Sequence, residues 1–233
     1  MKERDSGKSG KKPAKDGKNK ETWSEEDIRK IFKSIKSQSP QHYFEFTDPF
    51  WIMITTILSH RTKDEVSNQG GRNLYERYRD AKGLSMAEQK DVIALISKVG
   101  FSNVKSLRVI NAAKIIVEKF NGKVPDSIDT LMEIPGIGRK TANVILADAY
   151  SIPSIAVDTH VHRIANRIGI TTTNNPEKTE EALRKIIPRD MWLEFNPTLV
   201  EFGKVICKPI GPKCGECKIT SMCRYFSSNT GKK

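Results

Sequence analysis

The chain has 233 residues, 37% of them hydrophobic, so it is long enough to fold as one large domain or two smaller ones. Its mean hydropathy is −0.51, and no unbroken apolar run approaches the roughly twenty residues of a membrane-spanning helix, which argues against a membrane protein. The formal net charge of +12 and the pI near 9.5 favour a polyanionic partner, with nucleic acid as the first choice.

The chain begins with a lysine-rich segment, MKERDSGKSGKKPAKDGKNK, that has almost none of the apolar side chains needed for a core. We therefore expect a disordered basic tail over residues 1–22. It either holds DNA electrostatically or is a solvated leader without a role. Because the segment also lacks an apolar signal core, we expect an intracellular protein, cytoplasmic and associated with the nucleoid, rather than a secreted one. A second disordered tail is predicted at 227–233.

From Trp23 onward, apolar residues recur at spacings of three and four, which is the pattern of amphipathic helices. Alternating strand patterns are scarce, so the sequence predicts an all-α fold of nine or ten short helices. One segment, FWIMITTILS at 50–59, is apolar enough to be a buried helix. It runs into HRTKDE, where the cations His60 and Arg61 suit a helix C-terminus because the helix dipole favours positive charge there.

All four cysteines lie within one short segment, CKPIGPKCGECKITSMC, with the spacing C-x6-C-x2-C-x5-C. No cysteine upstream offers a disulfide partner, so four thiolates at Cys207, Cys214, Cys217 and Cys223 predict a single metal centre. Structural zinc usually binds paired C-x2-C units, whereas a [4Fe–4S] cluster accepts four thiolates at uneven spacing. The chemistry alone therefore leaves zinc and iron–sulfur open.

The segment SIDTLMEIPGIGRKTANVILADAY predicts a helix, a tight glycine turn and a second helix. Gly136 and Gly138 can adopt backbone angles that other residues avoid, so the turn could present N–H groups to a phosphate at a helix N-terminus. The alternative is an ordinary turn between two helices. Arg139 and Lys140 follow directly, although the partial positive charge of a helix N-terminus repels cations.

Two residues in this part of the chain have the chemistry of a catalytic pair. A neutral Lys140 amine could attack a sugar C1′ to form a Schiff base, whereas a charged one could simply bind phosphate at the surface. Asp158, in IAVDTHVHRIANRI, stands at the N-cap position of an amphipathic helix. A capping carboxylate that faces a cleft can also activate a nucleophile or stabilise a positively charged sugar.

Together, LMEIPGIGRKTANVILADAY, VDTHVHRIANR and the cysteine spacing closely resemble the endonuclease III family of DNA glycosylases, and the resemblance runs from about residue 25 to 226. It implies the two-lobed helix-hairpin-helix glycosylase fold. A six-helix barrel lobe is expected at 43–153, and a cluster lobe at 23–42 and 154–226. Double-stranded DNA would lie across the cleft between them.

The resemblance also assigns roles to individual residues. Lys140 matches the family's catalytic lysine and Asp158 its catalytic aspartate. The turn matches a phosphate-binding hairpin, and the four cysteines match the ligands of a [4Fe–4S] cluster, which favours iron–sulfur over zinc. The residues expected to contact DNA are Gly136, Ile137, Gly138, Arg139, His60, Arg61 and Phe101.

One segment departs from the family pattern. Where bacterial relatives have SAQATD, with a glutamine that fills the gap left by the flipped base, this chain has SHRTKD. Arg61 thus takes the glutamine position, and we expect its guanidinium to fill the gap by stacking and hydrogen bonding. Phe101, in VGFSN, matches the second wedge residue, and its ring could stack between bases.

The resemblance implies a monomeric base-excision-repair enzyme that binds DNA containing damaged bases or abasic sites. It would excise oxidised or otherwise damaged pyrimidines and nick the strand by β-elimination through a Schiff base on Lys140. One alternative is a monofunctional glycosylase for T or U opposite G, which would need Asp158 but no lysine. The other is a non-enzymatic helix-hairpin-helix DNA-binding module, which would leave the pairing of Lys140 with Asp158 as a coincidence.

Overall fold

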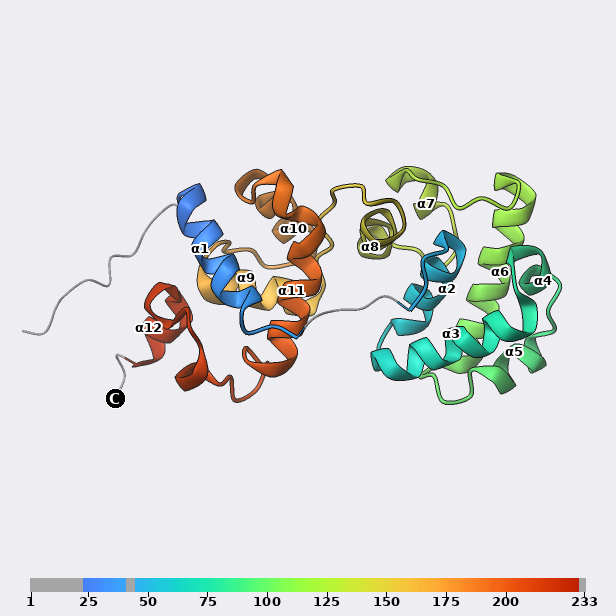
Figure 1. Ribbon diagram of the computed structural model, residues 1–233, viewed down its shortest axis with the longest axis horizontal. Coiled ribbons are helices and arrows are strands. Elements are labelled where there is room, and N and C mark those ends of the chain that lie inside the picture. The colour runs from blue at the N-terminus through green and yellow to red at the C-terminus, as the bar shows by residue number, and fades with distance from the viewer. Residues whose placement is uncertain (1–22, 41–44, 231–233) are drawn as a thin grey trace, which may run out of the picture.

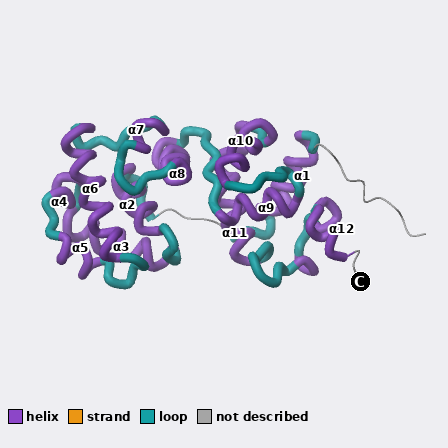
Figure 2. Tube along the Cα trace, turned by 180° about the vertical axis from the view of Figure 1, so that it is seen from behind, coloured by secondary structure: helices purple, strands orange, loops and turns teal. Residues whose placement is uncertain are grey.

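The computed structural model describes residues 23–40 and 45–230, and these residues form helices joined by short loops, with no strand among them (Figures 1 and 2). The all-α prediction is therefore confirmed. The predicted tail at 1–22 and the predicted lobe boundary at 42/43 lie outside the described residues. No helix in the described part of the chain is long and apolar enough to cross a membrane.

The helices gather into two lobes that lie side by side along the long axis of the molecule, each with its own apolar core (Figure 1). The first lobe is continuous in sequence and contains α2 (Pro49–Ser59), α3 (Asp64–Tyr78), α4 (Ala81–Ser85), α5 (Gln89–Leu95), α6 (Ser102–Phe120), α7 (Ile128–Met132) and α8 (Arg139–Tyr150). The second lobe joins both ends of the described chain and contains α1 (Glu25–Lys36), α9 (Thr159–Ile168), α10 (Pro176–Ile186), α11 (Trp192–Val205), α12 (Arg224–Thr230) and three short 3₁₀ helices (Arg189–Met191, Cys214–Glu216, Thr220–Met222).

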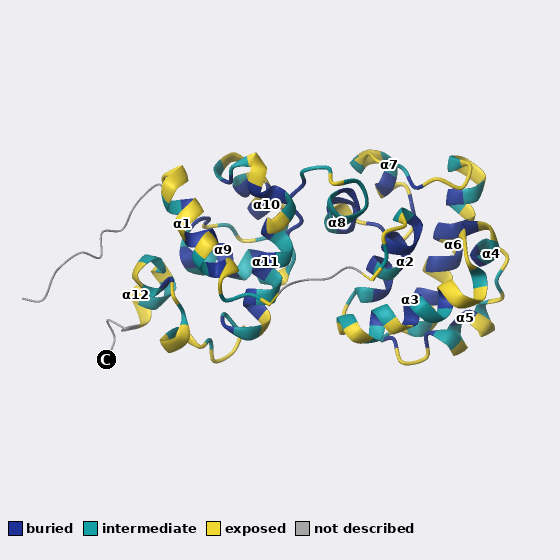
Figure 3. Ribbon diagram, viewed as in Figure 1, coloured by how far each residue is buried: buried dark blue, intermediate teal, exposed yellow. Residues whose placement is uncertain are grey.

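Helix α2 forms the centre of the first lobe, as its mostly apolar sequence predicts. Asp48 caps it by accepting hydrogen bonds from the backbone N–H groups of Phe50 and Trp51, and Pro49 occupies the first helical position, where a missing N–H costs nothing. Helices α3, α6 and α8 pack around α2. Figure 3 shows the resulting buried surface on the facing sides of these helices.

Helices α9 and α11 form the centre of the second lobe, and α1 packs on α11. Helix α1 begins with a reciprocal cap in which Ser24 and Asp27 each bond the other's backbone N–H. Its buried apolar face includes Ile28 and Ile31, each only 1% exposed. The N-terminal helix is thus held by residues more than a hundred positions later in the chain.

The structure corrects two predictions about the extent of helix. The described residues contain more helices than the nine or ten expected, because a single turn such as α4 is too short to show a period of 3.6. The predicted tail at 227–233 begins too early, since α12 continues to Thr230. This helix is held in place by Tyr225, whose ring lies 4.6 Å from the guanidinium carbon of Arg167 on α9.

Among the described residues, two ion pairs cross from one lobe to the other. The Nε of Arg139, at the start of α8, lies 3.2 Å from a carboxylate oxygen of Glu180 on α10. The Nζ of Lys204, on α11, lies 2.6 Å from a carboxylate oxygen of Asp64 at the start of α3. These contacts, together with the extended segment at 151–158, hold the lobes on either side of a cleft.

Candidate active site in the interlobe cleft

A cleft of about 1490 Å³ runs between the two lobes. The first lobe contributes the end of α2, the start of α3, the first turn of α6 and one face of α8. The second lobe contributes the N-terminus of α9 and one side of α11. Five of the residues expected to act on DNA line this cleft together: Lys140, Asp158, His60, Arg61 and Phe101.

The glycine turn between α7 and α8 adopts the predicted hairpin. Gly136 has a φ of +90°, a left-handed conformation that favours glycine. Gly138 differs from the prediction, because it caps α8 with an ordinary extended backbone (φ −94°). A Cβ on Gly138 would meet no atom within 4 Å, so neither strain nor crowding within the protein requires a glycine there. Ile137 is buried in the core of the first lobe, so only its backbone can face a ligand.

Lys140 and Asp158 reach the cleft from different lobes. Lys140 is the second residue of α8, and no side chain in the described part of the chain caps this helix. Asp158 caps α9, with one carboxylate oxygen accepting a hydrogen bond from the backbone N–H of Val161 at 2.8 Å. The predicted N-cap is therefore confirmed, and the other carboxylate oxygen has no hydrogen bond in the described part of the chain. One carboxylate thus fixes the helix and faces the cleft at the same time.

His60 connects the end of α2 to α8, one residue beyond Lys140. Its Nε2 lies 2.9 Å from the hydroxyl oxygen of Thr141, so the two groups share a hydrogen bond. Burial and, to a smaller extent, the charges of Lys140, Lys105 and Arg108 together lower the pKa of His60 to about 4. His60 is therefore a neutral imidazole at physiological pH, and not the cation that the sequence suggested.

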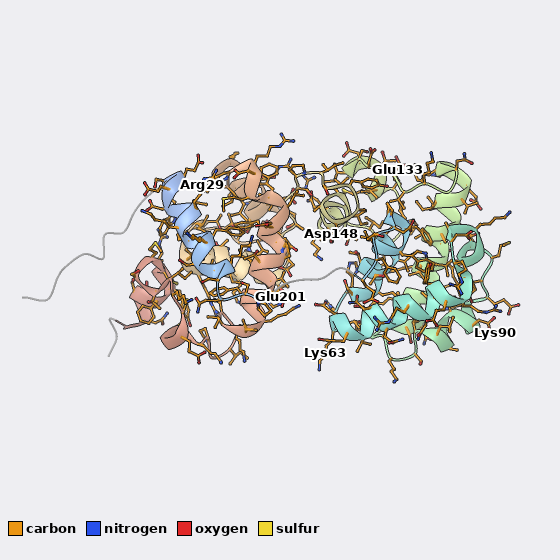
Figure 4. The ribbon with its side chains drawn as sticks, viewed as in Figure 1. Arg29, Lys63, Lys90, Glu133, Asp148 and Glu201 are labelled. Carbon is orange, nitrogen blue, oxygen red and sulfur yellow. The ribbon has the colours of Figure 1, made fainter. Side chains whose placement is uncertain are left out.

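The structure adds a carboxyl group that the sequence analysis did not single out. Asp148 follows Lys140 and Val144 at four-residue intervals on α8, and all three line the cleft. Figure 4 shows Asp148 beside α8, between the lobes. Burial raises the pKa of Asp148 to about 7, although the charge of Lys140 opposes the shift. A carboxyl that is about half protonated at pH 7 thus lies on the same helix face as the candidate nucleophile.

Arg139 does not face the cleft. Its guanidinium is held by Glu180, whose side chain is only 5% exposed and which also pairs with Arg184 at 3.4 Å. The side chain that the sequence offered as a phosphate contact therefore connects the two lobes in this structure. It does so one residue before Lys140, so the ion pair helps to set the position of the α8 N-terminus relative to the second lobe.

The two predicted wedge residues lie at the entrance to the cleft. Arg61 is exposed and Phe101 is 63% exposed, although phenylalanine is rarely so accessible. Both have left-handed backbones, with φ of 53° and 61°. Such angles cost about 1–2 kcal/mol for residues other than glycine, so both side chains are held in place against a local preference.

The four cysteines surround a separate, small apolar pocket in the second lobe. All four are free thiols of intermediate exposure, and Ile168, Phe202, Ile206 and Ile219 complete the lining. Burial raises the pKa of Cys217 and Cys223. Within the described residues, no three histidine, cysteine or acidic side chains converge closely enough to hold one metal ion.

One further residue near the site, Lys105, could have been found from the sequence. Lys105 is only 2% exposed, and it belongs to the apolar face of α6 that includes Val109, Ala112 and Ile116. A lysine on that face breaks the amphipathic pattern and marks a buried charge. Asp148 gave no comparable signal, because a single acidic residue near the end of a helix is usually solvated.

The perturbed groups predict opposite pH dependences of stability. Asp148 titrates near 7 in the folded protein but near 4 when unfolded, so its burial destabilises the fold increasingly as pH rises from 4 to 7. His60 titrates near 4 when folded and near 6.5 when unfolded, so it destabilises the fold as pH falls through that range. Asp148→Asn should therefore raise the unfolding free energy at pH 8 by the order of 2–4 kcal/mol, and the gain should vanish at pH 4.

Urea denaturation of Asp148→Asn and His60→Gln at pH 4 to 8 measures both effects. His60→Gln should lose less stability than the parent protein between pH 6.5 and 4. Parallel stability curves for a variant and the parent protein would contradict the assignment for that residue.

Known proteins agree with this architecture. A family model for the HhH-GPD superfamily of base excision DNA repair proteins matches residues 54–189. The chain is 43% identical to endonuclease III of Thermotoga maritima, over 85% of this chain and 93% of that one. It is 36% identical to endonuclease III of Synechocystis, over 77% and 82% of the two chains.

A solved structure described as a trapped endonuclease III–DNA covalent intermediate has the same fold. Its TM-score is 0.82 at 30% sequence identity, and the match covers 90% of this chain and all of that one. The helix-hairpin-helix glycosylase fold predicted from the motifs is thereby confirmed. The chain belongs to the HhH-GPD superfamily of base excision DNA repair proteins and, within it, to the endonuclease III family of DNA glycosylases.

Proposed function

We propose that the protein is a bifunctional glycosylase and abasic-site lyase that removes damaged pyrimidines from double-stranded DNA. The observation that carries this proposal is the placement of Lys140 and Asp158 on one cleft, each from a different lobe. Arg61, Arg108 and Lys63 on the same cleft suit a polyanion. We expect the protein to act as a monomer on chromosomal DNA in the cytoplasm.

The chemistry follows from these two side chains. The damaged nucleotide is flipped out of the duplex into the cleft, at a cost of about a few kcal/mol that is smallest for a poorly stacked lesion. The neutral amine of Lys140 attacks C1′, and the C1′–N bond breaks with its electron pair leaving on the base, which then takes up a proton. The carboxylate of Asp158 stabilises the positive charge that develops on the sugar.

Strand cleavage uses the same lysine. Ring opening gives a Schiff base between Lys140 and C1′. Loss of a proton from C2′ then expels the 3′-phosphate by breaking the C3′–O bond, and hydrolysis of the imine releases the enzyme. A lysine at the N-terminus of α8 is unfavourable because the helix dipole repels a cation there. Residues that oppose the local structural preference are expected at functional positions.

The turn before α8 is suited to hold the DNA backbone. The helix has no side-chain cap among the described residues, so its first N–H groups are open to an anion. The space around Gly138 is empty, and a side chain there would obstruct a phosphate approaching these N–H groups. Such a contact is independent of base sequence, so it would position the duplex without selecting the lesion.

The four cysteines fit a [4Fe–4S] cluster. They border one apolar pocket, yet no three of them converge on a single-ion site. A cluster of four irons is larger than one ion, so its thiolate ligands lie farther apart than those of zinc. We propose that Cys207, Cys214, Cys217 and Cys223 hold this cluster, which when bound would shape the loop at 207–223. Iron and sulfide analysis tests this, and zinc in their place would contradict it.

A panel of duplexes tests the activity. Thymine glycol, dihydrouracil, uracil opposite G and an abasic site are each incubated with the protein, and base release and strand nicking are measured separately. We expect release of the oxidised pyrimidines together with nicking, and a covalent complex on addition of borohydride. Release of uracil without nicking would instead indicate a monofunctional mismatch glycosylase, and binding without release would indicate a DNA-binding module.

A further inference from the structure

Lys105 lies beside the cleft, and the mechanism proposed above gives its buried ammonium no role. Its side chain is only 2% exposed, and within the described residues it forms no ion pair with a carboxylate. Burial and, to a smaller extent, the charge of Arg108 together lower the pKa of Lys105 to about 8. A buried charge without a counter-ion is costly, so its retention calls for a role.

Three oxygen atoms compensate the ammonium. Nζ of Lys105 donates to the backbone carbonyls of Leu58 at 2.7 Å and His60 at 2.6 Å, and to the hydroxyl of Thr62 at 2.8 Å. These three acceptors use all the donors of a lysine. They lie at the C-terminus of α2, where carbonyls lack helical partners and the dipole favours a cation. Lys105 therefore acts as a cap on α2 that is supplied by α6.

The capped segment carries Arg61. Two of the acceptors belong to His60 and Thr62, the residues on either side of Arg61. The ammonium therefore binds the loop both before and after Arg61. Arg61 itself has a left-handed backbone, and its side chain is exposed at the cleft. A loop residue in this conformation keeps it only when its surroundings fix it.

The same lysine is tied to the second wedge residue. Phe101 is the N-cap of α6, and its carbonyl accepts a hydrogen bond from the backbone N–H of Lys105 at 3.0 Å. The two segments are also in close contact, because a Cβ on Gly100 would lie 3.3 Å from the hydroxyl of Thr62 and 3.4 Å from the carbonyl of Arg61. The Arg61 loop and the start of α6 thus form one packed unit around Lys105.

We propose that Lys105 is a positioning residue for base flipping, which holds Arg61 and Phe101 at a fixed separation so that they enter the duplex as one preset wedge. This inference rests on the proposed glycosylase function. It assigns Lys105 no contact with the reacting atoms. Its effect is on the opening of a paired and stacked nucleotide, and it should matter least where no base pair has to be broken.

Lys105→Met tests the proposal, because methionine keeps the length of the side chain and removes all three donors. Single-turnover excision of thymine glycol paired with adenine should fall by at least about tenfold, the effect of one lost charged hydrogen bond. Nicking at a preformed abasic site should fall by less than about threefold. The fluorescence rise of 2-aminopurine placed beside the lesion, which reports unstacking on flipping, should be lost. Lys114→Met, an exposed lysine on the same helix, is the matched control and should match the parent protein.

A merely structural Lys105 predicts a different result. Lys105→Met would then lower the melting temperature and leave the ratio of the two reactions and the fluorescence signal unchanged, which would overturn the proposal. If that variant does not fold, Thr62→Val removes a single acceptor at nearly constant volume and should show the same selective loss, about threefold. A parent protein that neither excises nor nicks would instead overturn the proposed function itself.

Discussion

Lys140→Ala is expected to abolish borohydride trapping and to reduce base release and strand nicking by at least about a thousandfold, as expected when a covalent nucleophile is removed. The variant should fold at least as well as the parent protein. Alanine suits a helix interior, and removing a cation from the N-terminus of α8 should add about 0.3–1 kcal/mol of stability. The loss of activity can therefore be separated from loss of structure by comparing trapping on a thymine glycol duplex with thermal melting.

Lys98→Ala is the matched control for this experiment. Lys98 is exposed on the first lobe and does not line the cleft, so its removal should change trapping little while it removes the same charge. Base release that persisted in Lys140→Ala without nicking would show that water displaces the base. A covalent complex that persisted would show that another amine forms the Schiff base.

Asp158→Asn should reduce base release by about 10²–10⁴-fold while leaving the fold unchanged. Asparagine caps a helix about as well as aspartate, so the hydrogen bond to the N–H of Val161 survives and only the negative charge is lost. Nicking at a preformed abasic site should fall less, since no base has to leave. Rapid-quench measurement of the two reactions separates these steps.

A second substitution at the same position isolates the cap from the charge. Asp158→Ala should show the same catalytic loss as Asp158→Asn and an additional loss of about 1 kcal/mol of stability. Full activity in Asp158→Asn would contradict a catalytic role and leave Asp158 as a helix cap alone.

Much of the fold could be predicted because it depends on local patterns. Three features each depend on only a few consecutive residues: the apolar run at 50–59, the glycine turn before Arg139 and the capping position of Asp158. The structure has all three. The extra helix at 81–85 is a single turn whose ends are set by its cap and by packing, and periodicity does not detect it.

The parts of the site that could not be predicted depend on contacts between lobes and helices. Arg139 looks like a phosphate ligand until the buried carboxylate of Glu180 is placed beside it. His60 looks like a cation until burial and three nearby cations make it neutral. The protonation of Asp148 and the three acceptors of Lys105 likewise arise from neighbours that are distant in sequence.

The discontinuous second lobe has a consequence for the order of folding. Helices α2 to α8 follow one another, so the first lobe can complete its core soon after it leaves the ribosome. Helix α1 is made earlier, yet its partners lie on α11, and the ion pair between Lys36 and Glu194 spans 158 positions. The apolar face of α1 therefore stays exposed to solvent until almost the whole chain has been synthesised. The lobe that supplies Asp158 is thus the last to form, and a chain cut short before α11 would contain Asp158 without the packed lobe that positions it across the cleft from Lys140.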